Sequence, residues 1–275
     1  AGAGAGGAAA VRCGHLGPWA RALSAAFSLD GGLLLTGELA GHVRLWDSQQ
    51  ERCLNIFSQS GARVWAIDWC PSDHYFVSSG AGGAGLLWSV ERAAPLRALG
   101  PAEARFASSC AAWADVEVVR THPCNHLAAL AADETAALWD LAAAAPVRVM
   151  TGSSRVTALA FSPDGGRLAI GAEDGSLQLW DLAAGRVQAE APGAHRGPVL
   201  ALDFGWPSPG ATPSNETLLF SGGVDGSSQL RAVGSDLALL ANYEVTDSDG
   251  RRAQIVGGRF TLANLLVVAG VADSA

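Results

Sequence analysis

The sequence predicts an all-β protein built by repeating a unit of four short strands. Two kinds of segment recur in a fixed order along the chain, one carrying Trp and one with the pattern of strand, turn and strand. The recurring tryptophans stand at positions 46, 88, 139 and 180, close to the period of about 40–45 residues that is typical of four-stranded repeats. No stretch of comparable length shows the apolar spacing of a helix convincingly, which favours strands throughout.

The Trp segment is a short apolar run that ends in Trp and, in most copies, Asp. Its copies read VRLWD, GLLWS, AALWD and LQLWD, and they end at Asp47, Ser89, Asp140 and Asp181. A fifth copy, DGSSQLRAV at 225–233, aligns with DGSLQLWDL at 174–182 and has Arg231 in the Trp position. These copies indicate repeats that share one strand type.

The segment upstream of each Trp predicts a hairpin. Its copies read FSLDGGLLLTG, WCPSDHYFVSSG, THPCNHLAALA and FSPDGGRLAIG, and they begin at Phe27, Trp69, Thr121 and Phe161. Residues 156–161 alternate with the two-residue period of a strand, and Pro-Asp-Gly-Gly at 163–166 supplies the turn. Four such strands cannot bury their faces alone, so we expect the units to stack around an axis as blades of a β-propeller.

We expect two regions, an Ala/Gly-rich low-complexity linker at 1–12 and propeller repeats at 13–275. Five repeats are clear, a weaker terminal one lies at 255–270, and insertions near 101–112 and 205–215 account for the two long intervals. Propellers close with a whole number of blades, and rings of seven are common. We therefore predict a seven-bladed propeller in the full protein, with the first blade missing from this chain.

Composition argues against several classes of function. The net charge of −8 disfavours direct nucleic-acid contact, because such contact relies on basic side chains that neutralise phosphates. The longest nearly apolar run, 262–272, is about half of the roughly 20 residues that a membrane helix needs, so we expect no membrane partner. The five cysteines form no CxxC pair, which fits buried thiols in a reducing compartment.

Candidate chemical sites are weak. The GxGxxG matches at 2–7 and 80–85 lack the strand-to-helix context that a dinucleotide site requires. His122, Cys124 and His126 could supply zinc ligands, but they occupy the position of the hairpin turn and have no evident fourth ligand nearby. The sequence has no GxSxG nucleophile motif. We therefore predict no enzyme activity, no catalytic residue, no cofactor and no metal.

The repeats resemble the WD40 family, on the strength of Gly14-His15, the WD dipeptides, and an Asp six residues before Trp at Asp133 and Asp174. The resemblance implies a propeller whose blades are braced by hydrogen bonds among a loop His, a Ser or Thr in the second strand, an Asp in the next turn and the Trp. Matched by position, this network comprises His15, Thr36, Trp46, Ser78, Trp88, Asp133, Trp139, Asp174, Trp180, His195, Ser221 and Asp225. No repeat has the full set, so we expect apolar packing between blades to hold the ring.

The resemblance also implies one face of the ring on which partners usually dock. We expect Arg63, Arg155, Arg196 and Glu173 on this partner-facing rim. Arg63 and Arg155 each precede the Val that begins a first strand, so they should be equivalent. Arginine is enriched at binding hot spots because its planar fork pairs with carboxylates. The alternative is that these side chains are ordinary solvated charges.

The second and third repeats are similar to those of the TBP-associated factor 5 family of WD40 proteins. The shared order is Val64-Trp65, YFVS at 75–78, PLRALG at 95–100, Ala-Asp-Val at 114–116 and His122-Pro123, and RFTLANLLVVAG at 259–270 resembles the closing strands. That family implies a nuclear, non-enzymatic scaffold in transcription factor TFIID and, in some lineages, in the SAGA coactivator. Its propeller is expected to dock the histone-fold pair of TBP-associated factors 6 and 9.

Two other interpretations stay open. One is a cytoplasmic WD40 adaptor, such as a ubiquitin-ligase substrate receptor or a microtubule-associated scaffold, in which an F-box or coiled coil would replace an upstream helical dimerisation domain. The other is a propeller enzyme or ligand sensor that uses the central channel. It would need titratable side chains converging from several blades, whereas most strand positions here are small or apolar.

Overall fold

The computed structural model describes residues 21–28, 30–59, 63–69, 74–80, 85–99, 111–113, 126–130, 135–140, 146–162, 164–205, 217–246, 250, 252–260 and 266–272. Within these ranges the regular secondary structure consists of β-strands, and no helix is present. The helix-free pattern agrees with the predicted all-β class.

The described strands form five four-stranded antiparallel sheets and one two-stranded sheet, each made of consecutive strands. The first sheet has β1 (Ala22–Phe27), β2 (Leu33–Glu38), β3 (His42–Asp47) and β4 (Arg52–Ser58); the second has β5 (Val64–Trp69), β6 (Tyr75–Gly80), β7 (Gly85–Ser89) and β8 (Arg97–Leu99). The third has β9 (Ala111–Trp113), β10 (His126–Leu130), β11 (Thr135–Asp140) and β12 (Pro146–Thr151); the fourth has β13 (Val156–Phe161), β14 (Arg167–Ala172), β15 (Leu177–Asp181) and β16 (Arg186–Ala191). The fifth has β17 (Val199–Gly205), β18 (Thr217–Gly223), β19 (Ser227–Val233) and β20 (Leu237–Glu244), and the sixth has β21 (Ala253–Phe260) and β22 (Leu266–Ala272).

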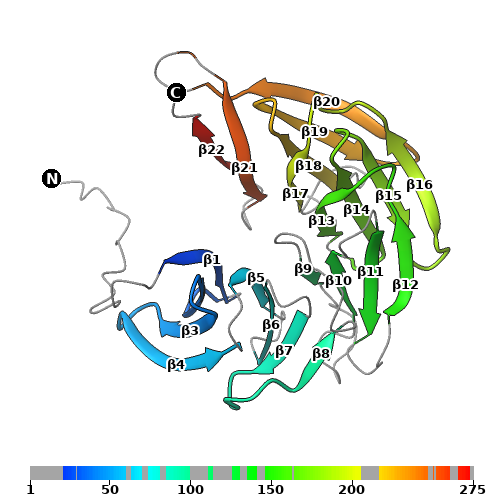
Figure 1. Ribbon diagram of the computed structural model, residues 1–275. Coiled ribbons are helices and arrows are strands. Elements are labelled where there is room, and N and C mark those ends of the chain that lie inside the picture. The colour runs from blue at the N-terminus through cyan, green and yellow to red at the C-terminus, as the bar shows by residue number, and fades with distance from the viewer. Residues whose placement is uncertain are drawn as a thin grey trace, which may run out of the picture.

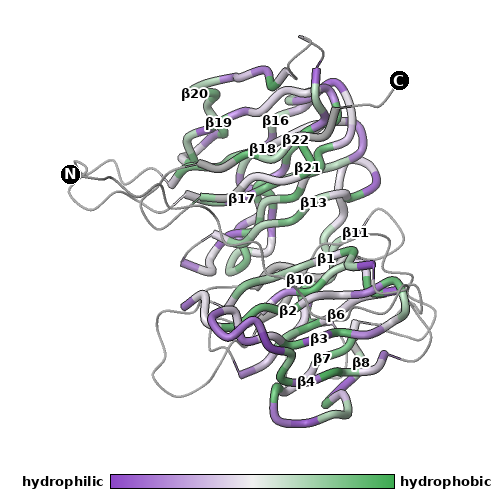
Figure 2. The backbone as a smooth tube through the Cα atoms, turned by 90° about the vertical axis from the view of Figure 1, so that its left-hand side faces the viewer, coloured by the Kyte–Doolittle hydropathy of each residue, from purple (hydrophilic) through white to green (hydrophobic). Residues whose placement is uncertain are grey.

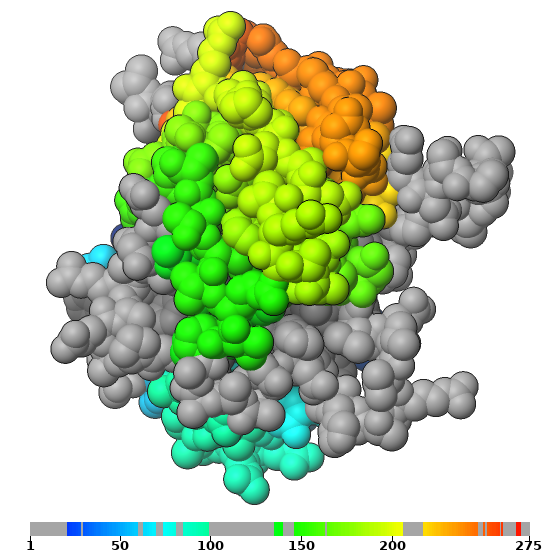
Figure 3. All heavy atoms as spheres, turned by 90° about the vertical axis from the view of Figure 1, so that its right-hand side faces the viewer, coloured from blue at the N-terminus to red at the C-terminus, as the bar shows by residue number. Residues whose placement is uncertain are grey.

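The sheets follow one another around an arc, with the first strand of each sheet toward the centre and the fourth strand outermost (Figure 1). Apolar residues lie mainly in the strands, whereas polar residues lie mainly at the turns (Figure 2). Figure 3 shows part of the outer surface, where the outer strands of the fourth and fifth sheets lie side by side. The predicted four-stranded repeat unit is confirmed.

The predicted hairpin turns follow from their polar side chains. In the fourth sheet, Asp164 Oδ1 accepts from Gly166 N at 3.0 Å, and Ser162 Oγ accepts from the backbone N of Arg167 at 2.9 Å. Gly165 between them has φ of 66°, a left-handed conformation that suits glycine. The first sheet repeats this turn with Ser28 and Asp30, so the recurring Ser-x-Asp-Gly-Gly segment specifies the link between the first two strands.

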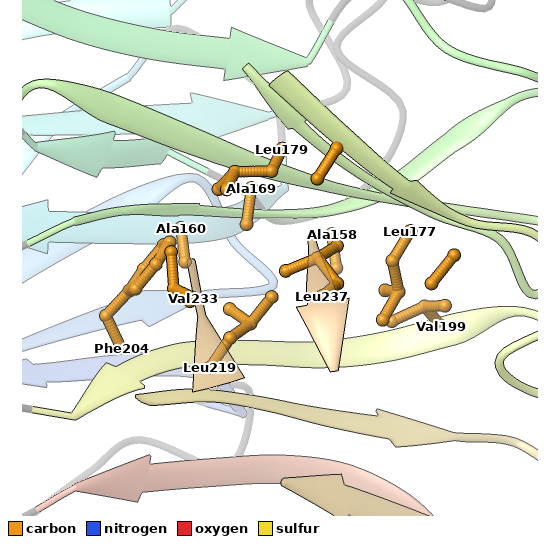
Figure 4. Close-up of a cluster of buried hydrophobic side chains, with 12 residues drawn as sticks. Ala158, Ala160, Ala169, Leu177, Leu179, Val199, Phe204, Leu219, Val233 and Leu237 are labelled. Carbon is orange, nitrogen blue, oxygen red and sulfur yellow. The ribbon is translucent and has the colours of Figure 1, made fainter. Parts of the chain in front are cut away.

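The core lies between successive sheets, as the cluster joining the fourth and fifth sheets shows (Figure 4). At three boundaries between sheets, a glycine of a second strand lies against the first core residue of the next inner strand. A Cβ added at Gly37 would lie 2.6 Å from Val64 Cγ1, one at Gly171 would lie 2.7 Å from Val199 Cγ1, and one at Gly222 would overlap Ile255 Cγ2. The absent side chain therefore sets how closely two sheets approach.

An aromatic residue is the last or next-to-last residue of each inner strand whose side chains are described. In the second, fourth and fifth sheets this residue is buried, with exposed fractions of 6% for Trp69, 8% for Phe161 and 4% for Phe204. The equivalent Phe27 of the first sheet is 55% exposed. Its neighbours in β1 are also mostly exposed, so the face of the first sheet that would meet a preceding sheet is open to solvent.

The first, second, fourth, fifth and sixth sheets each have a β-bulge in the inner strand, directly after the position that is equivalent to Val64 of the second sheet. The bulged residues are Leu23, Trp65, Thr157, Leu200 and Val256. A second bulge recurs in the outer strand beside the Trp position, at Leu54, Val147, Gln188 and Leu240. Bulges re-aim side chains, and five of these nine residues are large apolar groups that are at least 40% exposed.

Several predicted features lie outside the described residues. The 1–12 linker, His15, Asp133 and most of both insertions are among them. Strand β9 begins at Ala111, inside the expected insertion at 101–112, so the extent of that insertion stays a prediction. No described helix could cross a bilayer, and the described part of the chain holds no cluster of metal-ligating side chains.

Candidate docking rim and its polar networks

A hydrogen-bond relay braces the second sheet. Trp88 Nε1 donates to Ser78 Oγ at 2.9 Å, and Ser78 Oγ donates to Gln59 Oε1 at 2.8 Å. Trp88 and Ser78 are fully buried, and Gln59 is nearly so. Gln59 takes the place expected for a loop His, because its amide oxygen supplies the acceptor that Ser78 needs. The expected His motif does not mark this residue, since an acceptor there can come from several residue types.

The first and third sheets hold fragments of such a relay. Trp46 Nε1 donates to Thr36 Oγ1 at 2.8 Å. Trp139 is buried, and its Nε1 has no acceptor among the described residues. This agrees with the sequence, which places Ala129 where the first, second and fifth sheets have a hydroxyl. The first sheet adds an ion pair between the buried Glu38 and the partly buried Arg44, with Oε1 and Nε 2.5 Å apart.

The fourth sheet organises its turn around Asp174. The carboxylate accepts from Ser176 N at 2.9 Å and Ser176 Oγ at 2.6 Å. Burial raises the pKa of Asp174, but these hydrogen bonds outweigh it and hold the pKa below its ordinary value. Trp180 Nε1 donates to Gln178 Oε1 at 3.4 Å instead of to the second strand, since Ile170 occupies the hydroxyl position.

The fifth sheet brings together His195, Ser221 and Asp225. His195 Nε2 lies 2.8 Å from Ser221 Oγ, and His195 Nδ1 lies 2.7 Å from Ser227 Oγ and 3.5 Å from Asp225 Oδ1. Asp225 also accepts from Arg196 N at 2.9 Å, which ties the loop to the turn. Ser221 is fully buried and His195 is 2% exposed, and the hydrogen bonds of this cluster join the loop before β17 to β18 and to the turn before β19.

Arg231 occupies the Trp position of the fifth sheet and is 8% exposed. Its Nη2 donates to Gln229 Oε1 at 2.7 Å, and its Nη1 donates to the carbonyl of Leu237 at 2.7 Å. Gln229 in turn donates through Nε2 to the carbonyl of Ala194. The guanidinium therefore replaces the indole by bonding within its own sheet and, through Gln229, to the loop beside His195.

The buried imidazole makes stability depend on pH. Burial is the largest effect on His195 and lowers its pKa below the ordinary value, against the opposing effect of Asp225. As the pH falls, His195 is therefore protonated in the unfolded chain before it is protonated in the folded chain. The free energy of unfolding should fall as pH drops below about 6.5. The slope can reach about 1.4 kcal/mol per pH unit for one proton. Asp225, whose pKa is lowered by its hydrogen bonds despite burial, loses its contribution only at pH below about 4.

Urea denaturation at several pH values between about 5 and 8 measures this dependence. The His195→Gln variant should flatten it, because an amide does not titrate in this range and Gln59 already fills the equivalent place in the second sheet. If parent and variant lose stability in parallel on acidification, His195 is not the responsible group.

The four predicted rim residues are all exposed. Arg63 directly precedes β5 and Arg155 directly precedes β13, at the same end of their sheets. The backbone N of Glu173 donates to the carbonyl of Arg155 at 2.8 Å, so these two side chains start from adjacent points. Arg196 lies in the loop before β17. The side chains therefore share one end of the sheets.

Arg21 is a further rim residue that the sequence analysis missed. It is exposed and directly precedes β1. Its carbonyl accepts from Leu39 N at 2.9 Å, as the carbonyl of Arg155 accepts from Glu173 N. The signal missed was its spacing from the aromatic that ends the inner strand, which is the same for Arg21, Arg63 and Arg155. The equivalence of Arg21 was not apparent in the sequence because β1 begins with Ala22, whereas β5 and β13 begin with Val.

Three segments of the chain match a known repeat family. Residues 10–47, 51–89 and 144–181 match the profile of the WD domain, G-beta repeat, and each match ends at the last residue of a third strand. The chain is 32% identical over 154 residues to "Transcription initiation factor TFIID subunit 5" of Caenorhabditis elegans, an alignment that covers 55% of the chain and 22% of that relative. The chain thus covers less than a quarter of the length of the relative.

Proposed function

We propose that this chain, which belongs to the WD40-repeat family, is a non-enzymatic scaffold of TFIID that docks other protein subunits. The observation that carries the proposal is the similarity to TFIID subunit 5, at 32% identity over 154 residues. WD40 domains bind proteins, and the described polar clusters are explained as braces of the sheets. A fold of this kind hosts many functions, so the assignment to TFIID rests on the similarity and not on the architecture.

The partners proposed are the histone-fold pair of TBP-associated factors 6 and 9, with SAGA as a second complex and the nucleus as the location. The docking surface proposed is the exposed rim of Arg63, Arg155, Arg196 and Glu173. The net charge of −8 supports leaving direct DNA contact to other subunits. No membrane partner is part of the proposal.

The sheets are proposed to belong to a closed seven-bladed propeller. Support comes from the first sheet, where Phe27 is 55% exposed while its equivalents Trp69 and Phe204 are buried against the preceding sheet. A large aromatic at a core position is normally covered. One more blade against β1 would cover Phe27 and extend the arc toward closure.

Affinity purification of the tagged full-length protein from nuclear extract, with mass spectrometry of the recovered proteins, tests the function. TBP-associated factors, including 6 and 9, should be recovered, and a purified pair of these two should bind the chain directly. Recovery of cullin-type ligase subunits or cytoskeletal proteins in their place would move the protein to the cytoplasmic adaptor class and end the TFIID proposal.

A further inference from the structure

Two arginines and two apolar side chains alternate on the adjacent first and second sheets. Arg21 and Leu23 lie at the start of β1, and Arg63 and Trp65 lie at the start of β5. Strands β1 and β5 pack side by side, so the four residues occupy neighbouring, equivalent places at one end of the arc. We call them the arginine patch.

The two apolar residues of the patch are the bulged residues of their strands and lie outside the core. Leu23 is 40% exposed, Trp65 is half-buried, and neither belongs to the apolar core between the two sheets. The equivalent bulge residue of the fourth sheet, Thr157, turns its hydroxyl to the carbonyl of Val199 in the following sheet, at 2.6 Å. Leu23 and Trp65 have no hydroxyl for such a bond. Their bulges therefore present apolar surface where Thr157 makes a structural contact.

Leu23 also lies on a different side of β1 from the open face described above. Ala22 and Phe27 are the equivalents of Val64 and Trp69, which pack against the preceding sheet. Leu23 instead matches Thr157, which contacts the following sheet. A further blade against β1 would cover Phe27 and leave the patch accessible.

The charges of the patch are free to bind. Within the described residues neither Arg21 nor Arg63 has a carboxylate partner. The guanidinium of Arg63 lies over the Trp65 ring, with Cζ 5.8 Å from the ring centroid, a contact that orients the cation without neutralising it. The nearby Glu38 is buried and paired with Arg44. The patch therefore presents two cations beside apolar surface, a local arrangement that is complementary to an acidic ligand with an apolar side chain.

We propose that the arginine patch binds an extended acidic segment of a partner protein, in which carboxylates pair with Arg21 and Arg63 and an apolar side chain packs on Leu23 and Trp65. Arg and Trp are the residues most often found at binding hot spots, and a guanidinium can hold a carboxylate by two parallel hydrogen bonds. The inference rests on the proposed function only in that the rim faces a partner.

Selection from a random-peptide display library on the immobilised full-length protein tests this proposal. Enriched peptides should carry Asp or Glu on both sides of Leu, Phe or Trp. Titration of a labelled winning peptide, followed by fluorescence anisotropy, should show at least about tenfold weaker binding to the Arg21→Ala/Arg63→Ala and Trp65→Ala variants. The matched control is Arg92→Ala, an exposed arginine in the turn before β8 at the opposite end of the second sheet, which should bind as the parent does.

Several results would overturn the patch. They are the absence of enriched peptides, enrichment of peptides without acidic residues, equal binding by the double-arginine variant, and stronger binding of a single-stranded oligonucleotide that displaces the peptide. Purification from nuclear extract separates the two proposals. If the parent recovers TFIID subunits but binds no acidic peptide, the scaffold function stands and the patch does not. If the parent binds acidic peptides but recovers no TFIID subunit, the patch stands and the TFIID assignment does not.

Discussion

Replacing Trp69 by alanine should lower the free energy of unfolding by about 3–5 kcal/mol, the usual cost of truncating a buried aromatic side chain. Trp69 lies in the cluster between the first two sheets, with its ring 6.1 Å from that of Phe76. Its Nε1 also donates to the carbonyl of Ala26 at 2.9 Å, across the sheet boundary. The variant loses apolar burial, fills no space in return, and leaves that carbonyl without its donor.

Phe27→Ala is the matched control, because Phe27 ends the equivalent strand but is 55% exposed. It should cost less than about 1 kcal/mol, as surface substitutions usually do. Urea denaturation followed by circular dichroism gives both values, provided that the dependence on denaturant stays the same. Equal losses in the two variants would show that the first sheet is packed as the second one is. In a full-length protein with a further blade, the cost of Phe27→Ala should rise toward that of Trp69→Ala.

Gly222→Ala should destabilise the chain by about 1–3 kcal/mol, the range found when extra atoms are forced into a packed core. The added methyl group would overlap Ile255, which is fully buried at the start of the core in the sixth sheet. Relief requires the fifth and sixth sheets to move apart, because Ile255 is surrounded by Phe220 and Ala201. The matched control is Gly234→Ala, where a methyl group meets no atom within 4 Å, and its effect should stay within about 0.5 kcal/mol.

A double-mutant cycle identifies the contact. Ile255→Ala alone should cost about 2–5 kcal/mol as a cavity, but in the Gly222→Ala background it also removes the clash. The double variant should therefore be more stable than the sum of the two single effects predicts. Strict additivity would place the strain of Gly222→Ala somewhere other than Ile255.

Sequence patterns predicted the elements that depend on local chemistry. The Ser-x-Asp-Gly-Gly turns and the spacing of Trp from a hydroxyl in the second strand are properties of a single hairpin, so they can be inferred from residue order. The inter-sheet contacts were not predicted. Gly222 and Ile255 meet only after two sheets pack, and no motif marks that contact in the sequence.

Some polar and rim residues were also not predictable from residue order alone. Gln59 was not predicted because the relay needs only a hydrogen-bond acceptor beside Ser78, and several residue types can supply one. The bulges at Leu23 and Trp65 were missed because a bulge is a mismatch between two strands and is invisible in either strand alone. Without the bulges, Trp65 would be expected to face the core with Ile67 and Trp69, as part of an alternating strand.

Among the described residues, the extensive contacts between sheets join sheets that follow one another in the chain. Stability in such an arrangement is close to a sum of units and nearest-neighbour interfaces. Each inner strand then depends on two interfaces, except at the ends of the arc, where it depends on one. The two-stranded sixth sheet and the open first sheet should therefore fray before the interior does, and the fourth and fifth sheets should be the last cooperative unit to open. A strand with the same hydrogen bonds thus contributes more to the free energy of unfolding in the middle of the arc than at either end.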